Sequence, residues 1–127
     1  MTANWFRQLN FDEKSPIYLQ IVEFIKQGIA AGQLCDHDEL PSRRALAVQL
    51  GINPMTVQKA YQQLESEGYL QTSPNAVSRV SANRLQQKMI REQLIDLEVR
   101  QFIGGAKKLN LDFKEIIDLI SRHWDKS

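Results

Sequence analysis

The sequence has few of the residues that mark catalytic, disulfide-bonded or membrane proteins. It holds a single cysteine, Cys35, in 127 residues, which excludes an intramolecular disulfide and a multi-cysteine metal site and suits a reducing cytoplasm. Sixteen basic residues stand against 15 acidic ones, so the net charge is only +1 and gives no sign of a polyanion partner over the whole chain. No apolar stretch approaches the roughly 20 residues of a membrane span, and the first residues lack the pattern of a signal peptide. We therefore expect a cytoplasmic protein with no membrane partner.

Residues for catalysis or metal binding are equally scarce. Cys35 and His37 form the one thiol–imidazole pair close in sequence, and they lie in a polar, acidic segment. A cysteine and a histidine that lie two positions apart in a loop are no evidence of an activated nucleophile. Asp36, Asp38 and Glu39 can chelate a metal there, but solvated loop charges are the simpler interpretation. There is also no glycine-rich phosphate loop, so we expect no enzyme activity, no metal and no cofactor.

Turn and cap signals divide the chain into three parts: an arm at 1–14, a domain at 15–81 and a helical tail at 82–127. The arm carries apolar side chains that we expect to pack on another part of the protein: Trp5, Phe6, Leu9 and Phe11. The domain shows three helical patterns followed by two strand-like segments. Ser15, Ser42 and Asn53 are the expected helix caps, and glycines follow the expected helix ends. The expected ranges are 15–32, 42–50 and 53–68 for the helices and 69–72 and 77–81 for the strands.

The segment from Arg43 to Leu64 carries the strongest functional signal. Two short helices meet at Gly51, and Ala47 is small enough to let two helix backbones cross closely. This spacing is typical of a helix-turn-helix, whose second helix enters the DNA major groove. All charged residues between Leu40 and Leu64 are basic, and acidic residues flank this window on both sides. Local positive charge of this kind is what a phosphate-facing surface needs.

The stretch from Pro16 to Leu70 resembles the winged-helix domain of GntR-family transcription regulators. The matching hallmarks are Leu40-Pro41-Ser42, Arg44, Leu46-Ala47, Leu50-Gly51-Ile52, Thr56-Val57, Ala60-Tyr61, Leu64-Glu65 and Glu67-Gly68. The short two-helix tail, with Pro16-Ile17-Tyr18 and Asn53-Pro54, resembles the YtrA subfamily, whose members are small homodimers. The resemblance implies a mainly α fold with a small β-hairpin, in which a winged helix-turn-helix domain precedes a two-helix C-terminal dimerisation tail.

The candidate DNA-binding residues lie at the starts of two helices and in the wing. The resemblance places Ser42 and Arg44 against the DNA backbone or groove edge, and on the recognition helix Gln58 can read an adenine. Asn53 can equally serve only as a helix cap; for Arg43 and Arg44 we favour contact with DNA over the alternative of two solvated arginines. The wing lacks the family's glycine-rich turn, which leaves its contact with DNA open. The full candidate set is Ser42, Arg43, Arg44, Asn53, Pro54, Met55, Thr56, Gln58, Lys59 and Arg79.

The tail carries apolar residues at helical spacing on two successive segments, more than a lone helix pair can bury. An exposed apolar stripe predicts a partner helix, and the alternative is that both stripes fold back on the domain. Gly104-Gly105 can kink the first tail helix. The candidate dimerisation residues are Leu94, Ile95, Val99, Phe102, Leu109, Phe113, Ile116, Ile117, Ile120 and Trp124.

Together these features predict a sequence-specific DNA-binding transcription regulator, a repressor, that acts as a homodimer on two half-sites of double-stranded DNA. The alternative is a winged-helix protein-interaction module that has lost DNA binding. A small-molecule effector is possible but not indicated by the sequence.

Overall fold

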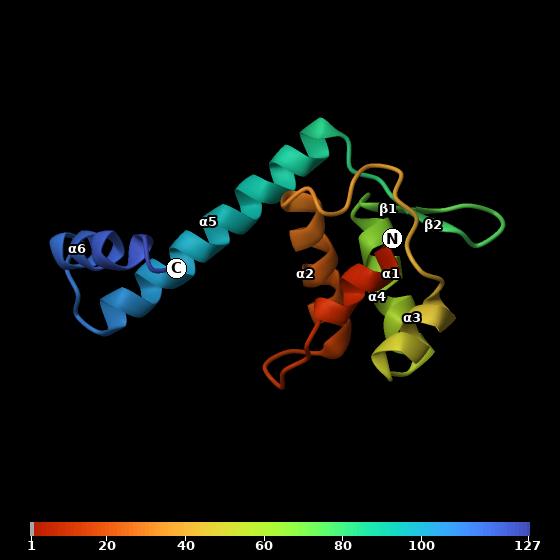
Figure 1. The fold of residues 1–127 in the computed structure, drawn as a ribbon, viewed down its shortest axis with the longest axis horizontal. Coiled ribbons are helices and arrows are strands. Elements are labelled where there is room, and N and C mark those ends of the chain that lie inside the picture. Colours follow the sequence, from red (N-terminus) through yellow and green to blue (C-terminus); the bar gives the residue numbers. More distant parts are fainter. Residues whose placement is uncertain (1) are drawn as a thin grey trace. The chain divides into compact units, whose positions relative to one another are not determined.

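The computed structural model describes residues 2–127, which form helices and one small hairpin (Figure 1). The chain divides into two compact units, the first ending at Arg91 and the second running from Glu92 to Ser127. The elements in chain order are α1 (Thr2–Trp5), η1 (Phe6–Gln8), α2 (Ile17–Ala30), α3 (Arg43–Leu50), α4 (Pro54–Ser66), β1 (Leu70–Thr72), β2 (Ser78–Val80), α5 (Arg84–Lys108) and α6 (Phe113–Trp124). The mainly α fold with a small hairpin is confirmed. Within the described range, no helix combines the length and the apolar character that crossing a membrane requires.

The starts of α3 and α4 are capped by the residues that the sequence predicted. The Ser42 Oγ accepts a hydrogen bond from the Ala45 backbone N at 3.1 Å, and the Asn53 Oδ1 accepts one from the Met55 backbone N at 2.8 Å. Gly51 ends α3 with a φ of 67°, a left-handed conformation that glycine adopts without steric cost. Short-range chemistry therefore accounts for the helix–turn–helix geometry.

The predicted cap of α2 is wrong. The N-cap position is held by Pro16, and no side chain caps the helix. The side chain of Ser15 does not take this role; its backbone carbonyl instead accepts a hydrogen bond from the Gln20 Nε2 at 2.7 Å. Pro16 stands at the N-cap with a φ of −55° and a ψ of 143°, and its side chain has no hydrogen-bond acceptor, so the helix begins without a side-chain cap.

The core of the first unit is built where α2, α3 and α4 meet, with the hairpin closing one side. Its fully buried side chains include Ile21, Ile25, Ile29, Leu46, Val57, Tyr61, Leu64 and Val80. Ala47 is buried as well, as expected for the small residue on the inner face of α3. The start of α5 completes this unit, because Ile90 is buried in the same core and the Gln87 Nε2 donates to the Ile29 carbonyl at 3.1 Å.

The N-terminal arm is part of this core rather than an appendage. Phe6 is completely buried, and the Trp5 ring stacks on Phe24 with a centroid separation of 4.0 Å. The Trp5 Nε1 donates to the Gln33 Oε1 at 2.9 Å. Gly28 makes room for this ring, because a Cβ at that position would lie 2.5 Å from the Trp5 Cζ2. The aromatic residues of the arm thus anchor it to α2.

The two strands pair in antiparallel register, with Gln71 opposite Arg79, and Arg79 also forms an isolated bridge with Glu39. The connecting turn contains no glycine, and Ala76 adopts a left-handed φ of 65°. That conformation is unfavourable for a residue with a Cβ. The wing predicted from the sequence is therefore present, with a turn that carries backbone strain.

In the second unit, α6 begins at a capping box, and α5 continues through Gly104-Gly105 as one helix. The Asp112 Oδ1 accepts a hydrogen bond from the Glu115 backbone N at 2.9 Å, and the Glu115 side chain accepts one from the Asp112 backbone N in return. Reciprocal caps of this kind fix a helix start with local contacts alone. The predicted last helix and its cap are confirmed.

Candidate nucleic-acid interface

The helix starts predicted to face DNA are exposed. Arg44, Asn53, Pro54 and Met55 are all exposed on the first turns of α3 and α4, and 69% of the Met55 surface is accessible. The side-chain oxygens of Ser42 and Asn53 are occupied by the capping hydrogen bonds described above. In the free protein, the side chain of Asn53 therefore serves as a helix cap.

Arg43 turns inward rather than outward. Its Nη2 lies 2.6 Å from the Glu65 Oε1, and its guanidinium carbon lies 5.2 Å from the centre of the Tyr61 ring. The side chain is 23% exposed, and its Nε is buried with no hydrogen-bond partner among the described residues. The structure thus gives Arg43 a role inside the domain, which its place in the basic window did not predict.

Glu65 connects this arginine to the wing. The same Oε1 accepts a hydrogen bond from the Thr72 Oγ1 at 2.8 Å, and the Thr72 Oγ1 lies 2.9 Å from the Ser78 Oγ. Because the Thr72 proton goes to Glu65, the buried Ser78 hydroxyl is the donor in the second contact. These contacts form a chain, the Glu65 network (Arg43, Glu65, Thr72 and Ser78), that joins the start of α3, the end of α4 and both strands.

Tyr61 fixes the loop that leads into α3. Its hydroxyl donates to the Pro41 carbonyl at 2.8 Å, and its side chain lies in the core. Burial holds the pKa of Tyr61 well above its ordinary value, while the nearby Arg43 guanidinium acts in the opposite direction. The tyrosine is therefore a neutral hydrogen-bond donor that positions the segment just before Ser42.

The acidic residues that follow the basic window are paired inside the domain. Glu65 pairs with Arg43, and the Glu67 Oε1 lies 2.6 Å from the Lys26 Nζ. Arg44 makes no hydrogen bond or ion pair within residues 2–127, and Lys59 places its Nζ 4.1 Å from the centre of the Tyr18 ring. Because these pairings compensate the two carboxylates, the exposed face at the starts of α3 and α4 keeps its positive charge.

Arg79, the candidate wing contact, is partly engaged. Its Nη2 lies 3.3 Å from the Glu39 Oε1, and its Nη1 donates to the His37 carbonyl at 3.2 Å. Both side chains of the ion pair are more than half exposed, so solvent screens the pair and it holds the arginine only weakly.

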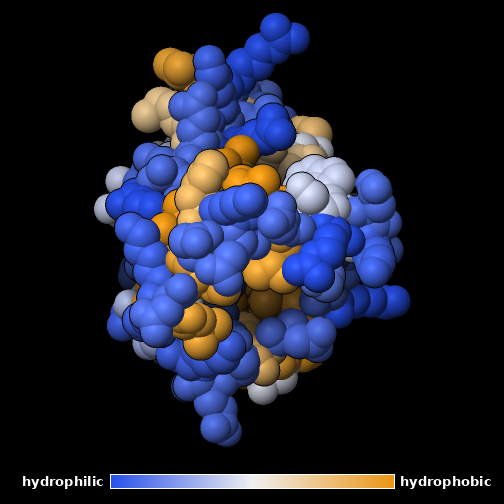
Figure 2. All heavy atoms as spheres, turned by 90° about the vertical axis from the view of Figure 1, so that its left-hand side faces the viewer, coloured by the Kyte–Doolittle hydropathy of each residue, from blue (hydrophilic) through white to orange (hydrophobic). Residues whose placement is uncertain are grey.

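The tail residues predicted to form a dimer contact are mostly accessible. Leu94 and Ile116 are half-buried, and the other eight are exposed, with 49% of Phe102 and 76% of Trp124 accessible. The end of α5 and the inner face of α6 also line an apolar groove of about 560 Å³ that includes Phe102, Ala106 and Ile120. Figure 2 shows one face of the molecule, on which hydrophobic residues are exposed among hydrophilic ones. The single chain leaves most of this apolar surface in water.

Comparisons with known proteins agree with this architecture. Residues 17–80 match the family model described as bacterial regulatory proteins of the gntR family. The chain is 35% identical over 117 residues to the HTH-type transcriptional repressor YtrA of Bacillus subtilis, covering 86% of this chain and 90% of that protein. Among solved structures, a GntR family transcriptional regulator from Listeria monocytogenes superposes with a TM-score of 0.81 and 29% identity, over 88% of this chain and 98% of that one.

A second solved structure contains DNA. The DNA-binding domain of AraR in complex with operator ORX1 is similar to 57% of this chain and 93% of its own, with a TM-score of 0.51 and 27% identity. A domain related to the first unit therefore has its DNA-bound state on record.

Proposed function

This chain belongs to the GntR family of bacterial regulatory proteins, and on that premise we propose that it is a transcriptional repressor that binds a two-half-site operator as a homodimer. The observation that carries the proposal is the exposed, acid-free face at the starts of α3 and α4, behind which the flanking acids are paired internally. The operator complex of AraR supports DNA as the partner, and the name of the YtrA relative supports repression. We place the protein in the cytoplasm, where bacterial DNA lies, and assign it no enzymatic activity.

In this proposal the start of α4 enters the major groove. Gln58 and Thr56 are half-buried, and their polar ends contact the edges of the DNA bases. The exposed Met55 contacts thymine methyl groups. Arg44 and Lys59 contact phosphates, since neither is paired with an acid. Arg44 is the side chain whose loss should weaken binding most, because it is exposed and makes no hydrogen bond or ion pair with another described residue.

The remaining candidates act more indirectly. Ser42, Asn53 and Pro54 set the two helix starts, where the positive end of each helix dipole favours an approaching phosphate. Arg79 reaches DNA only by exchanging its weak pair with Glu39 for a phosphate. Arg43 supports the geometry through the Glu65 network.

We test DNA binding with the full-length chain and the DNA upstream of its own gene. Fluorescence anisotropy at increasing salt, with an unrelated duplex as competitor, separates the two candidate functions. The DNA affinity of a DNA-binding regulator falls as the salt concentration rises, because binding releases counterions from the phosphates. A footprint of such a regulator shows two protected half-sites. A protein-interaction module that has lost DNA binding shows neither salt-dependent binding nor a footprint.

The exposed apolar residues of the tail support the homodimer. Contiguous apolar surface of this kind is rare on monomers and marks interaction sites, and Phe102 and Ile117 both lie on it. Sedimentation of Phe102→Glu and Ile117→Glu should show dissociation to monomers at concentrations where the unmodified chain is dimeric. Val48→Glu places the same charge on an exposed apolar residue of the first unit and should leave the dimer intact. Unchanged dimers in both tail variants would refute the assignment.

A further inference from the structure

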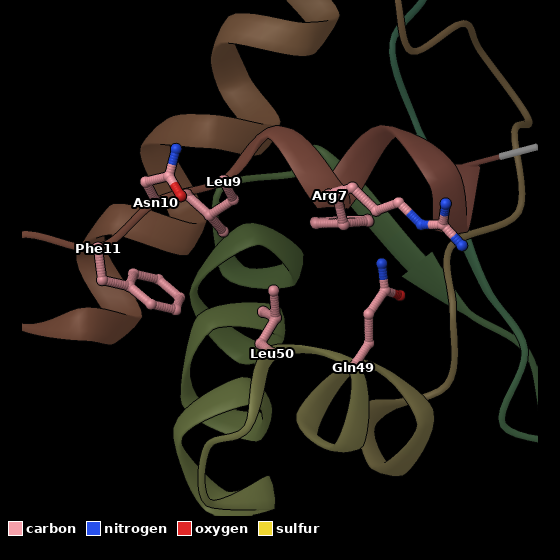
Figure 3. A pocket seen from close by; sticks show the side chains of 7 residues that line it. Arg7, Leu9, Asn10, Phe11, Gln49 and Leu50 are labelled. Atoms are coloured by element: carbon pink, nitrogen blue, oxygen red, sulfur yellow. The ribbon is translucent and has the colours of Figure 1, made fainter.

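A cavity of about 380 Å³ lies between the N-terminal arm and the end of α3 (Figure 3). Its volume is within the range of small-molecule pockets, and every residue of its lining belongs to the first unit. The lining residues are Phe6, Arg7, Leu9, Asn10, Phe11, Gln49 and Leu50. None of the assigned DNA-binding or dimerisation residues takes part.

The lining combines an apolar floor with a polar rim. Phe6 is buried, and Leu9, Phe11 and Leu50 pack partly against the core. In Figure 3, Leu9, Phe11 and Leu50 converge on one side, while Gln49 points from α3 toward the arm beside Arg7. The cavity therefore offers an apolar compartment next to amide and guanidinium groups.

The charge of this rim is positive. Arg7 is exposed and makes no hydrogen bond or ion pair with any part of the chain that the structure describes, and no acidic residue lines the cavity among residues 2–127. A guanidinium without a carboxylate partner favours an anion and can bind a carboxylate through two parallel hydrogen bonds. The apolar floor in turn favours a ligand body without charge. Together they select a small organic anion with an aromatic or aliphatic body.

The position of the cavity couples it to the recognition helix. Gln49 and Leu50 are the last residues of α3, directly before the turn at Gly51 that leads into α4. A ligand that bridges the arm and this end of α3 would contact the hinge between the two helices of the motif. It would also neutralise Arg7 beside that motif, which lowers the attraction for phosphate.

From these observations we propose that the cavity is an effector site for a small organic anion and that its occupation weakens DNA binding. The second part rests on the proposed repressor function, whereas the first part does not. The site is formed by the arm and α3 together, so the arm has a function beyond filling the core.

Binding is tested without DNA, so that its failure is separate from any failure of the proposed function. The probe is phenylacetate, and its neutral isostere phenylacetamide is the control ligand; the readout is the NMR signals of the Asn10 and Gln49 side-chain amides in the full-length protein. Phenylacetate should shift both amides to saturation and bind about tenfold more tightly than phenylacetamide, because the charge-assisted contact is lost in the amide. Arg7→Gln should remove this preference, and Arg84→Gln, which changes another exposed arginine of the first unit, should not.

Two results would overturn the site: no saturable shift of these amides, or a carboxylate preference that persists in Arg7→Gln. A third measurement tests the coupling between the cavity and DNA binding. Saturating phenylacetate should lower the DNA affinity of the unmodified chain but not that of Arg7→Gln. If Arg7→Gln alone lowers DNA affinity and its salt dependence while phenylacetate does not bind, the arginine contacts phosphate and the effector site is refuted.

Discussion

Replacing Glu65 by glutamine isolates the charge at the centre of the Glu65 network. The substitution keeps the shape of the side chain and an oxygen that can accept from Thr72, but it removes the negative charge 2.6 Å from the Arg43 Nη2. Arg43 is then left with a partly buried guanidinium whose Nε already lacks a partner among the described residues. The first unit should therefore unfold more easily.

The size of the effect follows from the burial of the pair. A hydrogen bond to a charged group contributes about 1.5–3 kcal/mol to stability. Arg43 and Glu65 are 23% and 32% exposed, so solvent screens part of this energy. We expect the free energy of unfolding to fall by about 1.5 kcal/mol, which lowers the urea midpoint by about 1 M for a unit of this size.

The two tryptophans make the assay specific to the first unit. Trp5 stacks on Phe24 there, whereas Trp124 lies exposed on α6. In a Trp124→Phe background the fluorescence of Trp5 alone reports unfolding. The protein concentration is kept fixed, because any self-association adds stability by mass action. Glu23→Gln, an exposed change of the same kind on α2, should change the free energy of unfolding by less than about 0.5 kcal/mol. Equal midpoints for the two variants would refute the structural role of the network.

Three further changes test other parts of the structure. Arg44→Ala should weaken operator binding by about 1–3 kcal/mol in anisotropy titrations with an unchanged circular dichroism spectrum, and unaltered affinity would remove Arg44 from the interface. Gly28→Ala should displace the Trp5 ring, because the new Cβ would lie 2.5 Å from it, and a red shift of the Trp5 emission would show this; an unshifted spectrum contradicts the packing. Because burial raises the pKa of Tyr61, this tyrosine ionises at lower pH in the unfolded chain than in the folded one, so the stability it contributes is present below about pH 10 and declines above it. Tyr61→Phe should flatten this decline in the free energy of unfolding. An alkaline stability profile identical to that of the unmodified chain would argue against the buried hydroxyl.

Features set by neighbours in sequence were predictable. The caps at Ser42, Asn53 and Asp112 each bind a backbone N–H two or three residues away, so a short motif contains both partners. Gly51 likewise follows from one backbone angle. The hairpin and the helical tail were also predictable, because their patterns of apolar and turn residues extend over short stretches of sequence.

Features set by distant partners were not predictable in the same way. Arg43 was assigned to the DNA face because its sequence neighbours are basic, yet its partner Glu65 is 22 positions away and only the packing of α3 on α4 brings them together. The sequence predicted that the arm packs on another part of the protein, but a periodic pattern could not identify Phe24 and Gly28 as the residues it packs against. The predicted cap at Ser15 is wrong because α2 begins one residue later than expected, which puts Pro16 at the N-cap; at α4 the same kind of dipeptide places Asn53 at the N-cap and Pro54 inside the helix.

The internal pairing of Glu65 and Glu67 has a consequence for how the protein searches the genome. Both acids are compensated within the first unit, so on a chain of net charge +1 the local positive charge at the starts of α3 and α4 meets the duplex, and its attraction for phosphates is the same for any base sequence. Discrimination between sites then depends on contacts with base edges rather than on this bulk attraction.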